Sequence, residues 1–159
     1  MVPEELPFRP HGYIEDHAVV RRIGNRDIYL GNVHAADPDR HDWSFTFVLS
    51  ATSEPQPLTT HHHPIVDGPE IEWSRFEAAV DATRDLYRRD GLLLVHCTAG
   101  ISRSTTLVAA TLAAEEGLSL SDALDAVTDA RPFAQPHPHL HELAVIYLAA
   151  EPGGASARR

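Results

Sequence analysis

The sequence has 159 residues, 43% of them apolar, enough for one globular domain whose core needs no disulfide or metal to hold it. Its 23 acidic residues outnumber 13 basic ones, all arginine, for a formal net charge of −10. This charge argues against nucleic acid or an anionic membrane as a partner, because binders of either need clustered positive charge. The single cysteine, Cys97, excludes an internal disulfide framework and a cysteine-rich zinc module.

The two ends of the chain differ in composition from its middle. Residues 1–17 hold three prolines among acidic and aromatic residues and predict an extended arm, whereas residues 152–159 lack large apolar side chains and predict a disordered tail. The start carries acids where a signal peptide would carry a basic region, and no apolar run approaches the roughly 20 residues of a membrane span. We therefore expect a soluble cytoplasmic protein with its catalytic domain at 18–151.

Strand-like segments come first along the chain. Residues 18–23, 28–31 and 45–51 predict strands, and 58–66 is a weaker candidate. Residues 92–96, Leu-Leu-Leu-Val-His, form the short apolar run of a buried central strand.

Helical patterns fill the rest. Apolar residues at helical spacing predict a helix over 76–87, and further helices are expected from Arg103 to Gly117, from Ser119 to just before Pro132, and over about 140–150. The expected fold is α/β, with a central, mostly parallel mixed sheet of about five strands flanked by helices.

The segment after the last strand carries the chemistry. It reads His-Cys-Thr-Ala-Gly-Ile-Ser-Arg-Ser over residues 96–104, and we call residues 97–103 the cysteine loop. A tight loop at a helix N-terminus turns backbone N–H groups toward an anion, and an arginine adds a planar fork matched to two phosphate oxygens. The residues expected to bind phosphate are Thr98, Ala99, Gly100, Ile101, Ser102 and Arg103.

The same electrostatic field favours a thiolate. A cysteine at a helix N-terminus beside an arginine ionises readily, so Cys97 is the expected nucleophile for in-line attack on phosphorus. His96 would orient the loop through hydrogen bonds, and Ser104 would donate its hydroxyl to the departing sulfur.

Phosphoryl transfer also needs an acid for the leaving oxygen and a base for water. Asp67, in the turn Pro-Ile-Val-Asp-Gly-Pro, is the first candidate, with Glu70 and Glu72 next. Asp81 and Asp85 lie one helical turn apart and are interpreted as a solvated face.

The sequence resembles the dual-specificity phosphatases, the small-domain branch of the cysteine-based protein tyrosine phosphatases. The cysteine loop is very close to that branch's signature, and the likeness extends over roughly residues 18–150, including Ile28–Asn32, Val48–Leu49, Glu54–Pro55, Pro64–Asp67 and the Arg131–Pro132 pair. The resemblance implies that Cys97 is the nucleophile, Arg103 the phosphate binder, Asp67 the general acid and base, and Ser104 the thiolate partner. It also implies a single-domain protein phosphatase of protein tyrosine phosphatase-like fold, with no cofactor.

Three departures from the family pattern bear on the substrate. His137 stands where the family often has asparagine, which leaves a supporting contact open. We expect no kinase-docking domain before the catalytic one, and this expectation argues against the phosphatases of mitogen-activated kinases. The loop interior holds neither lysine nor histidine, unlike the inositol-lipid phosphatases and RNA triphosphatases of the superfamily, so a phosphorylated protein or peptide is the expected substrate. The sequence leaves open whether phosphotyrosine or phosphoserine and phosphothreonine are preferred. It also leaves the oligomeric state open.

Eleven histidines invite a metal interpretation, especially His61–His63 and the group His137, His139 and His141. Neighbouring rings on a strand alternate in direction, and no cysteine or acid cluster completes a four-ligand site. We expect no metal site and a solvated or helix-end role for these histidines instead.

Two other functions of the protein remain: a sulfurtransferase or arsenate-reductase-like thiol enzyme, and a phosphoprotein-binding pseudoenzyme.

Overall fold

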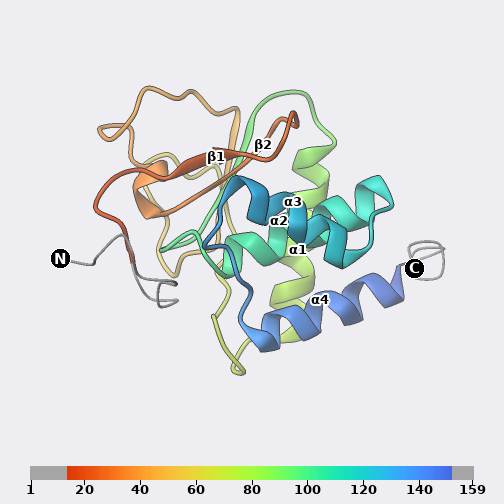
Figure 1. The fold of residues 1–159 in the computed structure, drawn as a ribbon. Coiled ribbons are helices and arrows are strands. Elements are labelled where there is room, and N and C mark those ends of the chain that lie inside the picture. Colours follow the sequence, from red (N-terminus) through yellow and green to blue (C-terminus); the bar gives the residue numbers. More distant parts are fainter. Residues whose placement is uncertain (1–13, 152–159) are drawn as a thin grey trace.

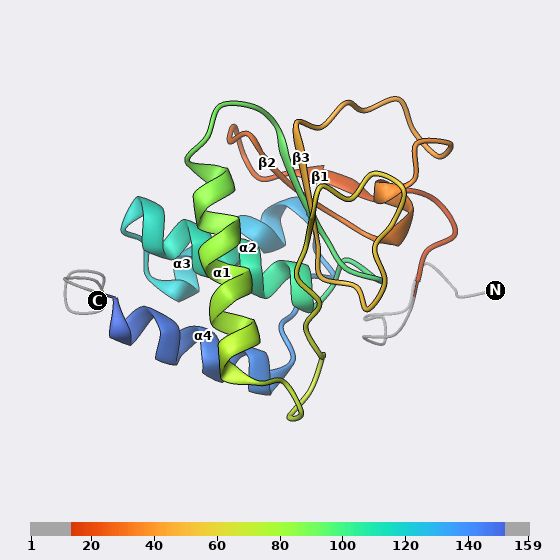
Figure 2. The same ribbon diagram turned by 180° about the vertical axis from the view of Figure 1, so that it is seen from behind.

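The structure is a computed structural model that describes residues 14–151. The sheet lies on one side of the molecule and four α-helices gather on the other (Figure 1), and the view from behind shows helix α1 crossing in front of the others (Figure 2). The expected tail at 152–159 and all but the last four residues of the expected arm at 1–17 lie outside the described residues.

Five strands form one sheet in the order β1-β2-β5-β3-β4, where β1 pairs antiparallel with β2 and all other neighbours are parallel. Their bounds are β1 Val20–Arg22, β2 Ile28–Gly31, β3 Phe47–Ser50, β4 His61–His62 and β5 Leu93–His96. The predicted mixed, mostly parallel sheet is therefore confirmed.

The strand expected at 58–66 is much shorter than predicted. Proline at 57 and 64 brackets it and supplies no N–H to a ladder. In addition, Val48 N donates to the Thr60 hydroxyl at 2.8 Å instead of to a backbone carbonyl. Only His61 and His62 pair as β4, at the edge of the sheet.

Strand β5 places the cysteine loop. Its four residues are buried, and His96 lies level with Gly31 at the end of β2 and with Ser50 at the end of β3. Three parallel strands thus finish at one edge, which is where ligands bind in open α/β sheets.

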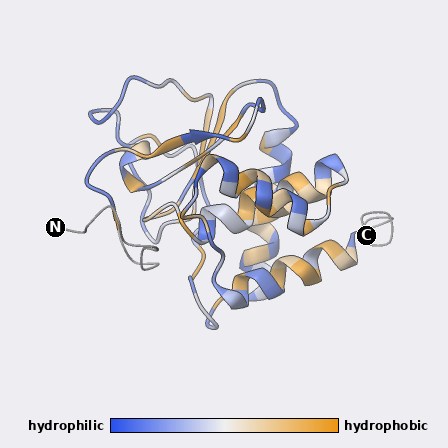
Figure 3. Cartoon of the chain, in the orientation of Figure 1, coloured by the Kyte–Doolittle hydropathy of each residue, from blue (hydrophilic) through white to orange (hydrophobic). Residues whose placement is uncertain are grey.

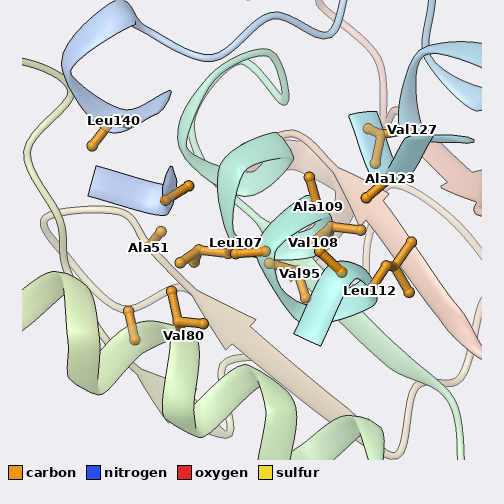
Figure 4. Close-up of a cluster of buried hydrophobic side chains, with 14 of the residues drawn as sticks. Ala51, Val80, Val95, Leu107, Val108, Ala109, Leu112, Ala123, Val127 and Leu140 are labelled. Atoms are coloured by element: carbon orange, nitrogen blue, oxygen red, sulfur yellow. The ribbon is translucent and has the colours of Figure 1, made fainter. Parts of the chain in front are cut away.

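Four helices cover one face of the sheet. They are α1 Trp73–Tyr87, α2 Arg103–Glu116, α3 Leu120–Ala130 and α4 Pro138–Ala150. Helix α2 contacts the other three as well as β2 and β5, and every residue from Ser104 to Ala114 is buried. Figure 4 shows Leu107, Val108 and Leu112 of α2 surrounded by side chains of the sheet and of the other helices. Within residues 14–151 no helix is long and apolar enough to cross a bilayer.

The helix boundaries follow local signals. Gly117 ends α2 where the sequence predicts, with a φ of 70°. A left-handed residue at this position lets the last carbonyls of a helix be capped, and glycine adopts that conformation most easily because it has no Cβ. The Ser119 hydroxyl accepts a hydrogen bond from Asp122 N at 3.0 Å and starts α3. Helix α1 begins at Trp73, three residues before the predicted start, and α4 begins at Pro138.

The opposite face of the sheet is covered by the segment that follows β2. Tyr29, Val48 and Leu94 point to that face and pack against Ala35 and Ala36 of the 3₁₀ helix η1, Val33–Ala36. Apolar and polar stretches alternate along this segment, whereas the centre of the helical layer is largely apolar (Figure 3). Because both faces are buried, the central strands are held rigidly beneath the site.

Candidate active site

Cys97 lies directly after β5, at the floor of the loop that leads into α2. Its side chain is buried, and its Sγ atom lies 3.2 Å from the hydroxyl oxygen of the fully buried Ser104. Gly100 has a φ of +70°, and a Cβ there would come within 3.0 Å of the backbone of Gly31, so the turn requires glycine.

Every backbone carbonyl from Cys97 to Ser102 accepts a hydrogen bond, and for residues 98–101 the donor comes from a distant segment of the chain. The donors and distances are His96 Nδ1 to Cys97 O at 3.2 Å, Val33 N to Thr98 O at 3.0 Å, Arg131 Nη2 to Ala99 O and Arg131 Nε to Gly100 O at 3.1 Å each, Gln135 N to Ile101 O at 2.8 Å, and Thr106 N to Ser102 O at 3.0 Å. A hydrogen bond to each carbonyl therefore fixes the orientation of every peptide unit in this stretch of the loop.

The N–H groups of the same peptides point the other way. All described peptide bonds are trans, so each N–H lies opposite the carbonyl of the preceding residue. Within residues 14–151 none of the backbone N–H groups of residues 98–102 donates to a protein acceptor, although four of these five residues are buried. Buried N–H groups are normally paired, so this row of donors is built for an external anion.

The Arg103 guanidinium bridges three segments around the loop. Nη1 donates to the Ala51 carbonyl at 3.4 Å and to the Ile65 carbonyl at 3.3 Å, and Nη2 donates to the Thr98 hydroxyl at 3.0 Å. Arginine has five N–H donors, so two have no acceptor within residues 14–151 and can meet ligand oxygens. The side chain is half-buried, so water screens its charge less than it would at the surface.

Asp67 is tied to the cysteine loop through one hydroxyl. Ser102 Oγ donates to Asp67 Oδ1 at 2.6 Å and accepts from the backbone N–H of His137 at 2.8 Å. Because the His137 N–H occupies a lone pair of the hydroxyl, the serine proton is directed at the carboxylate. Asp67 Oδ2 makes no hydrogen bond to another described residue and is the oxygen available to carry a proton.

The structure separates Asp67 from the other acidic candidates. Glu70 and Glu72 are exposed, and Glu72 pairs with Arg75 at 3.2 Å. Asp81 and Asp85 are exposed on α1, where Asp81 accepts from the Tyr147 hydroxyl at 2.5 Å and Asp85 pairs with Arg89 at 2.7 Å. Of these five acids only Asp67 makes a hydrogen bond to the cysteine loop in the part of the chain that the structure describes.

His96 supports the loop as a neutral ring. Because a carbonyl oxygen can only accept, the Nδ1 atom of His96 carries the proton and donates to Cys97 O. The Nε2 atom of His96 then accepts from the Ser50 hydroxyl at 2.6 Å. The Thr59 hydroxyl, 2.7 Å from Ser50 Oγ, then donates to that oxygen. Burial lowers the pKa of His96 to about 4, and the Arg103 charge acts in the same direction. His96 therefore orients the loop by hydrogen bonding and not by charge.

The other histidines are only partly as expected. His61 and His62 are half-buried on β4, and His62 Nε2 donates to the Thr52 carbonyl at 2.8 Å, so the expectation of a solvated run is wrong there. Burial and the two neighbouring rings lower the pKa of His63. His137 has the expected helix-end role, since its Nδ1 accepts from His139 N at 3.1 Å and caps α4. Among residues 14–151 no three His, Cys, Asp or Glu side chains come together in a way that would hold a metal ion.

The position of His137 also settles the contact that its identity left open. Its backbone N–H supports Ser102 by donating to the hydroxyl oxygen at 2.8 Å. The sequence interpretation did not assign Ser102 to the acid, nor Arg131 and Glu15 to the loop. The Arg131–Pro132 pair was visible only as part of the family resemblance, and nothing local to Glu15 separates it from the other acids of the N-terminal segment.

A strand that delivers a buried cysteine, five residues with inward N–H groups, and an arginine that opens the next helix define a cysteine-based phosphatase site on a protein tyrosine phosphatase-like fold. The family model "Dual specificity phosphatase, catalytic domain" matches residues 28–147. The chain belongs to the dual-specificity phosphatase family.

Individual relatives agree in sequence and fold. Dual specificity protein phosphatase 15 of Homo sapiens is 37% identical over 118 residues, which cover 70% of this chain and 40% of the relative. Human DUSP28 superposes with a TM-score of 0.71 at 27% identity, covering 82% of this chain and 93% of that structure. A mouse putative dual specificity phosphatase complexed with zinc tungstate superposes with a TM-score of 0.67 at 25% identity, covering 87% and 92%. The chain thus spans less than half the length of human dual specificity protein phosphatase 15.

Proposed function

We propose that this chain hydrolyses phosphate monoesters of phosphotyrosine, phosphoserine or phosphothreonine in proteins through a phosphocysteine intermediate. The observation that carries the proposal is the row of backbone N–H groups at residues 98–102, which donate to no acceptor within residues 14–151 and lie between Cys97 and Arg103 in the loop. A phosphate dianion is the ligand that satisfies such donors best.

The reaction proceeds in two displacements. The Cys97 thiolate attacks phosphorus, an S–P bond forms and the P–O ester bond breaks, while protonated Asp67 gives its proton to the leaving oxygen. Deprotonated Asp67 then accepts a proton from water as the water oxygen attacks phosphorus and the S–P bond breaks. The Ser104 hydroxyl, 3.2 Å from Sγ, donates a hydrogen bond to the departing thiolate.

The choice of a phosphoprotein substrate rests on two features. Arg103 is the only basic residue in the sequence of the cysteine loop, so a second phosphate on the same small molecule would find no further cation in the loop. The relatives that the chain matches are named protein phosphatases. A panel of phosphopeptides differing only in the phosphorylated residue tests this choice and measures the preference among the three.

The mechanism is tested by Cys97→Ser. We expect turnover of a phosphopeptide to be abolished while binding of tungstate, a tetrahedral oxyanion, is retained, because a hydroxyl is a much weaker nucleophile and the backbone donors remain. Calorimetric titration with tungstate and a phosphate-release assay measure the two properties. Hydrolysis by Cys97→Ser at the wild-type rate would overturn the covalent mechanism.

A sulfurtransferase assay and the phosphate-release assay separate the proposed function from the other two. A sulfurtransferase would transfer sulfur from thiosulfate to cyanide and would not depend on Asp67, so full sulfurtransferase activity in Asp67→Asn would replace our proposal. A pseudoenzyme would bind phosphopeptides without releasing phosphate. Phosphate release that requires both Cys97 and Asp67 supports the proposed phosphatase.

A further inference from the structure

Glu15 lies five residues before the first strand, which begins at Val20, and its carboxylate is buried against Arg131. Its side chain is 9% exposed, and Oε1 and Oε2 accept from Arg131 Nη1 at 3.1 and 3.3 Å. Arg131 follows α3 and is 2% exposed, so the pair is shielded from water. The two residues are separated by 116 positions in the sequence.

Arg131 is the residue that holds the middle of the cysteine loop. Its Nη2 and Nε atoms donate to the carbonyls of Ala99 and Gly100 at 3.1 Å each. In trans peptides these two bonds turn the N–H groups of Gly100 and Ile101 toward the anion position. One guanidinium thus fixes two consecutive donors of the site.

A guanidinium in this position requires a counter-charge. Burial opposes the charged form of Arg131, and Glu15 supplies the negative charge that offsets it. The segment around Glu15 is itself fixed, because Asn32 Nδ2 donates to the His17 carbonyl at 2.9 Å and Val19 N donates to Asn32 Oδ1 at 3.0 Å. Glu15 is therefore presented to Arg131 by a held backbone.

We propose that Glu15 is a positioning residue for the phosphate site, acting through Arg131 on the orientation of the Gly100 and Ile101 N–H groups. The proposal rests on the proposed function and extends it to a residue that precedes the matched residues 28–147. The segment before the first strand thus sets the geometry of the anion site without touching the substrate.

The test compares Glu15→Gln, which keeps the shape of the side chain but removes its charge, with Glu15→Asp and with the control Asp16→Asn. Asp16 is adjacent and fully exposed, so its substitution removes an equal charge at the surface. Loss of a direct transition-state donor costs about 10²–10³ in kcat. Misalignment of two donors through Arg131 should cost Glu15→Gln about 10- to 100-fold in kcat/KM and a similar factor in tungstate affinity, with partial rescue in Glu15→Asp. Asp16→Asn should stay within about twofold of the wild type.

Amide hydrogen exchange separates local misalignment from general destabilisation. At a temperature well below the unfolding midpoint of each variant, exchange should rise in the peptide that covers residues 97–103 more than in one that covers α1. Equal increases throughout the chain would overturn the positioning role, as would wild-type rate and tungstate affinity in Glu15→Gln. A wild-type protein that binds tungstate but releases no phosphate would refute the proposed function, while the tungstate and exchange measurements would still test Glu15.

Discussion

The cysteine loop and the acid segment, residues 64–72, meet at the same site but are held in opposite ways. Each carbonyl of the loop from residue 97 to 102 has a hydrogen-bond donor, and the loop lies between β2, α2 and the residues after α3. In the acid segment Val66 is 47% exposed. Among the described residues, the backbone N–H groups of this segment that donate a hydrogen bond are those of Ile65, to Ala51 O, and Ile71, to Gly68 O, at 3.3 Å each.

Phosphate binding and proton donation therefore depend on two regions that are held to different degrees. Phosphate binding relies on donors that are already aligned before the substrate arrives, which is how electrostatic stabilisation is most effective. The proposed proton donor, Asp67, is instead a carboxylate anchored mainly through Ser102. Damage to the loop should therefore slow all substrates alike, whereas damage to the acid segment should depend on how much the leaving oxygen needs a proton.

Arg103→Lys should give the largest effect. A single ammonium cannot make the two parallel hydrogen bonds of a guanidinium, nor the contacts to Ala51, Ile65 and Thr98. We expect kcat/KM to fall by about 10³–10⁵, the range found for arginines that stabilise phosphoryl transfer, with the same factor for good and poor leaving groups. Steady-state rates on a series of aryl phosphates check this, with the exposed Arg89→Lys as control. Retention of most activity in Arg103→Lys would remove Arg103 from its assigned role.

Asp67→Asn should give a loss that varies with the leaving group. On phosphopeptides the phosphorylation step should slow by about 10²–10⁴, the usual contribution of a positioned proton donor, and the loss should shrink for aryl phosphates with acidic phenols. Single-turnover measurements isolate that step from the later hydrolysis, in which Asp67 acts as base. Asp85→Asn, exposed on α1, is the matched control. An equal loss across leaving groups would place the proton donor elsewhere.

Ser102→Ala should weaken the same step more modestly. The substitution removes the hydroxyl that joins Asp67 Oδ1 to the His137 N–H but leaves the N–H groups of the loop intact. We expect about a tenfold loss on phosphopeptides, and a much smaller loss in an Asp67→Asn background because the two changes act on one interaction. A double-mutant cycle of single-turnover rates measures this coupling, with the exposed Ser121→Ala as control. Additive effects of the two substitutions would show that Ser102 does not position the acid.

The fold was largely predictable because its signals are local. The apolar run at residues 92–96 and the periodicities of the helices specify which elements form, and Gly117 and Ser119 mark boundaries through single-residue conformational preferences. The edge strand β4 was overestimated, since its pairing depends on a threonine side chain of the same segment replacing a backbone partner.

The residues expected to act on the phosphate were predictable from the sequence, whereas the residues that hold the loop in place were not. Cys97, Arg103 and Ser104 are close in sequence, so their spacing alone brings them together around one loop. The residues that hold the loop carbonyls come from distant positions: tertiary packing brings Val33 and Arg131 to the loop and Glu15 to Arg131. No sequence period relates such residues, and a glutamate that neutralises a buried arginine looks like any surface acid until the fold is known.

The smallest effect concerns His96 and appears in stability and not in rate at neutral pH. Burial lowers the pKa of His96 from its ordinary 6.5 to about 4, so below pH 6.5 the unfolded chain binds a proton that the folded chain does not. The stabilising contribution is therefore complete above pH 6.5 and falls as the pH drops toward 4, by about 2 kcal/mol at pH 5. Urea unfolding at pH 7 and pH 5 should show a stability difference smaller by this amount in His96→Gln than in the wild type or in the exposed control His141→Gln. Because His96→Gln also alters the contact with Ser50, histidine resonances of the wild-type protein provide a second measurement, in which one ring stays neutral down to pH 5. If all rings titrated near pH 6.5, the neutral, hydrogen-bonding role of His96 would be wrong, and a charged ring would have to support the loop instead.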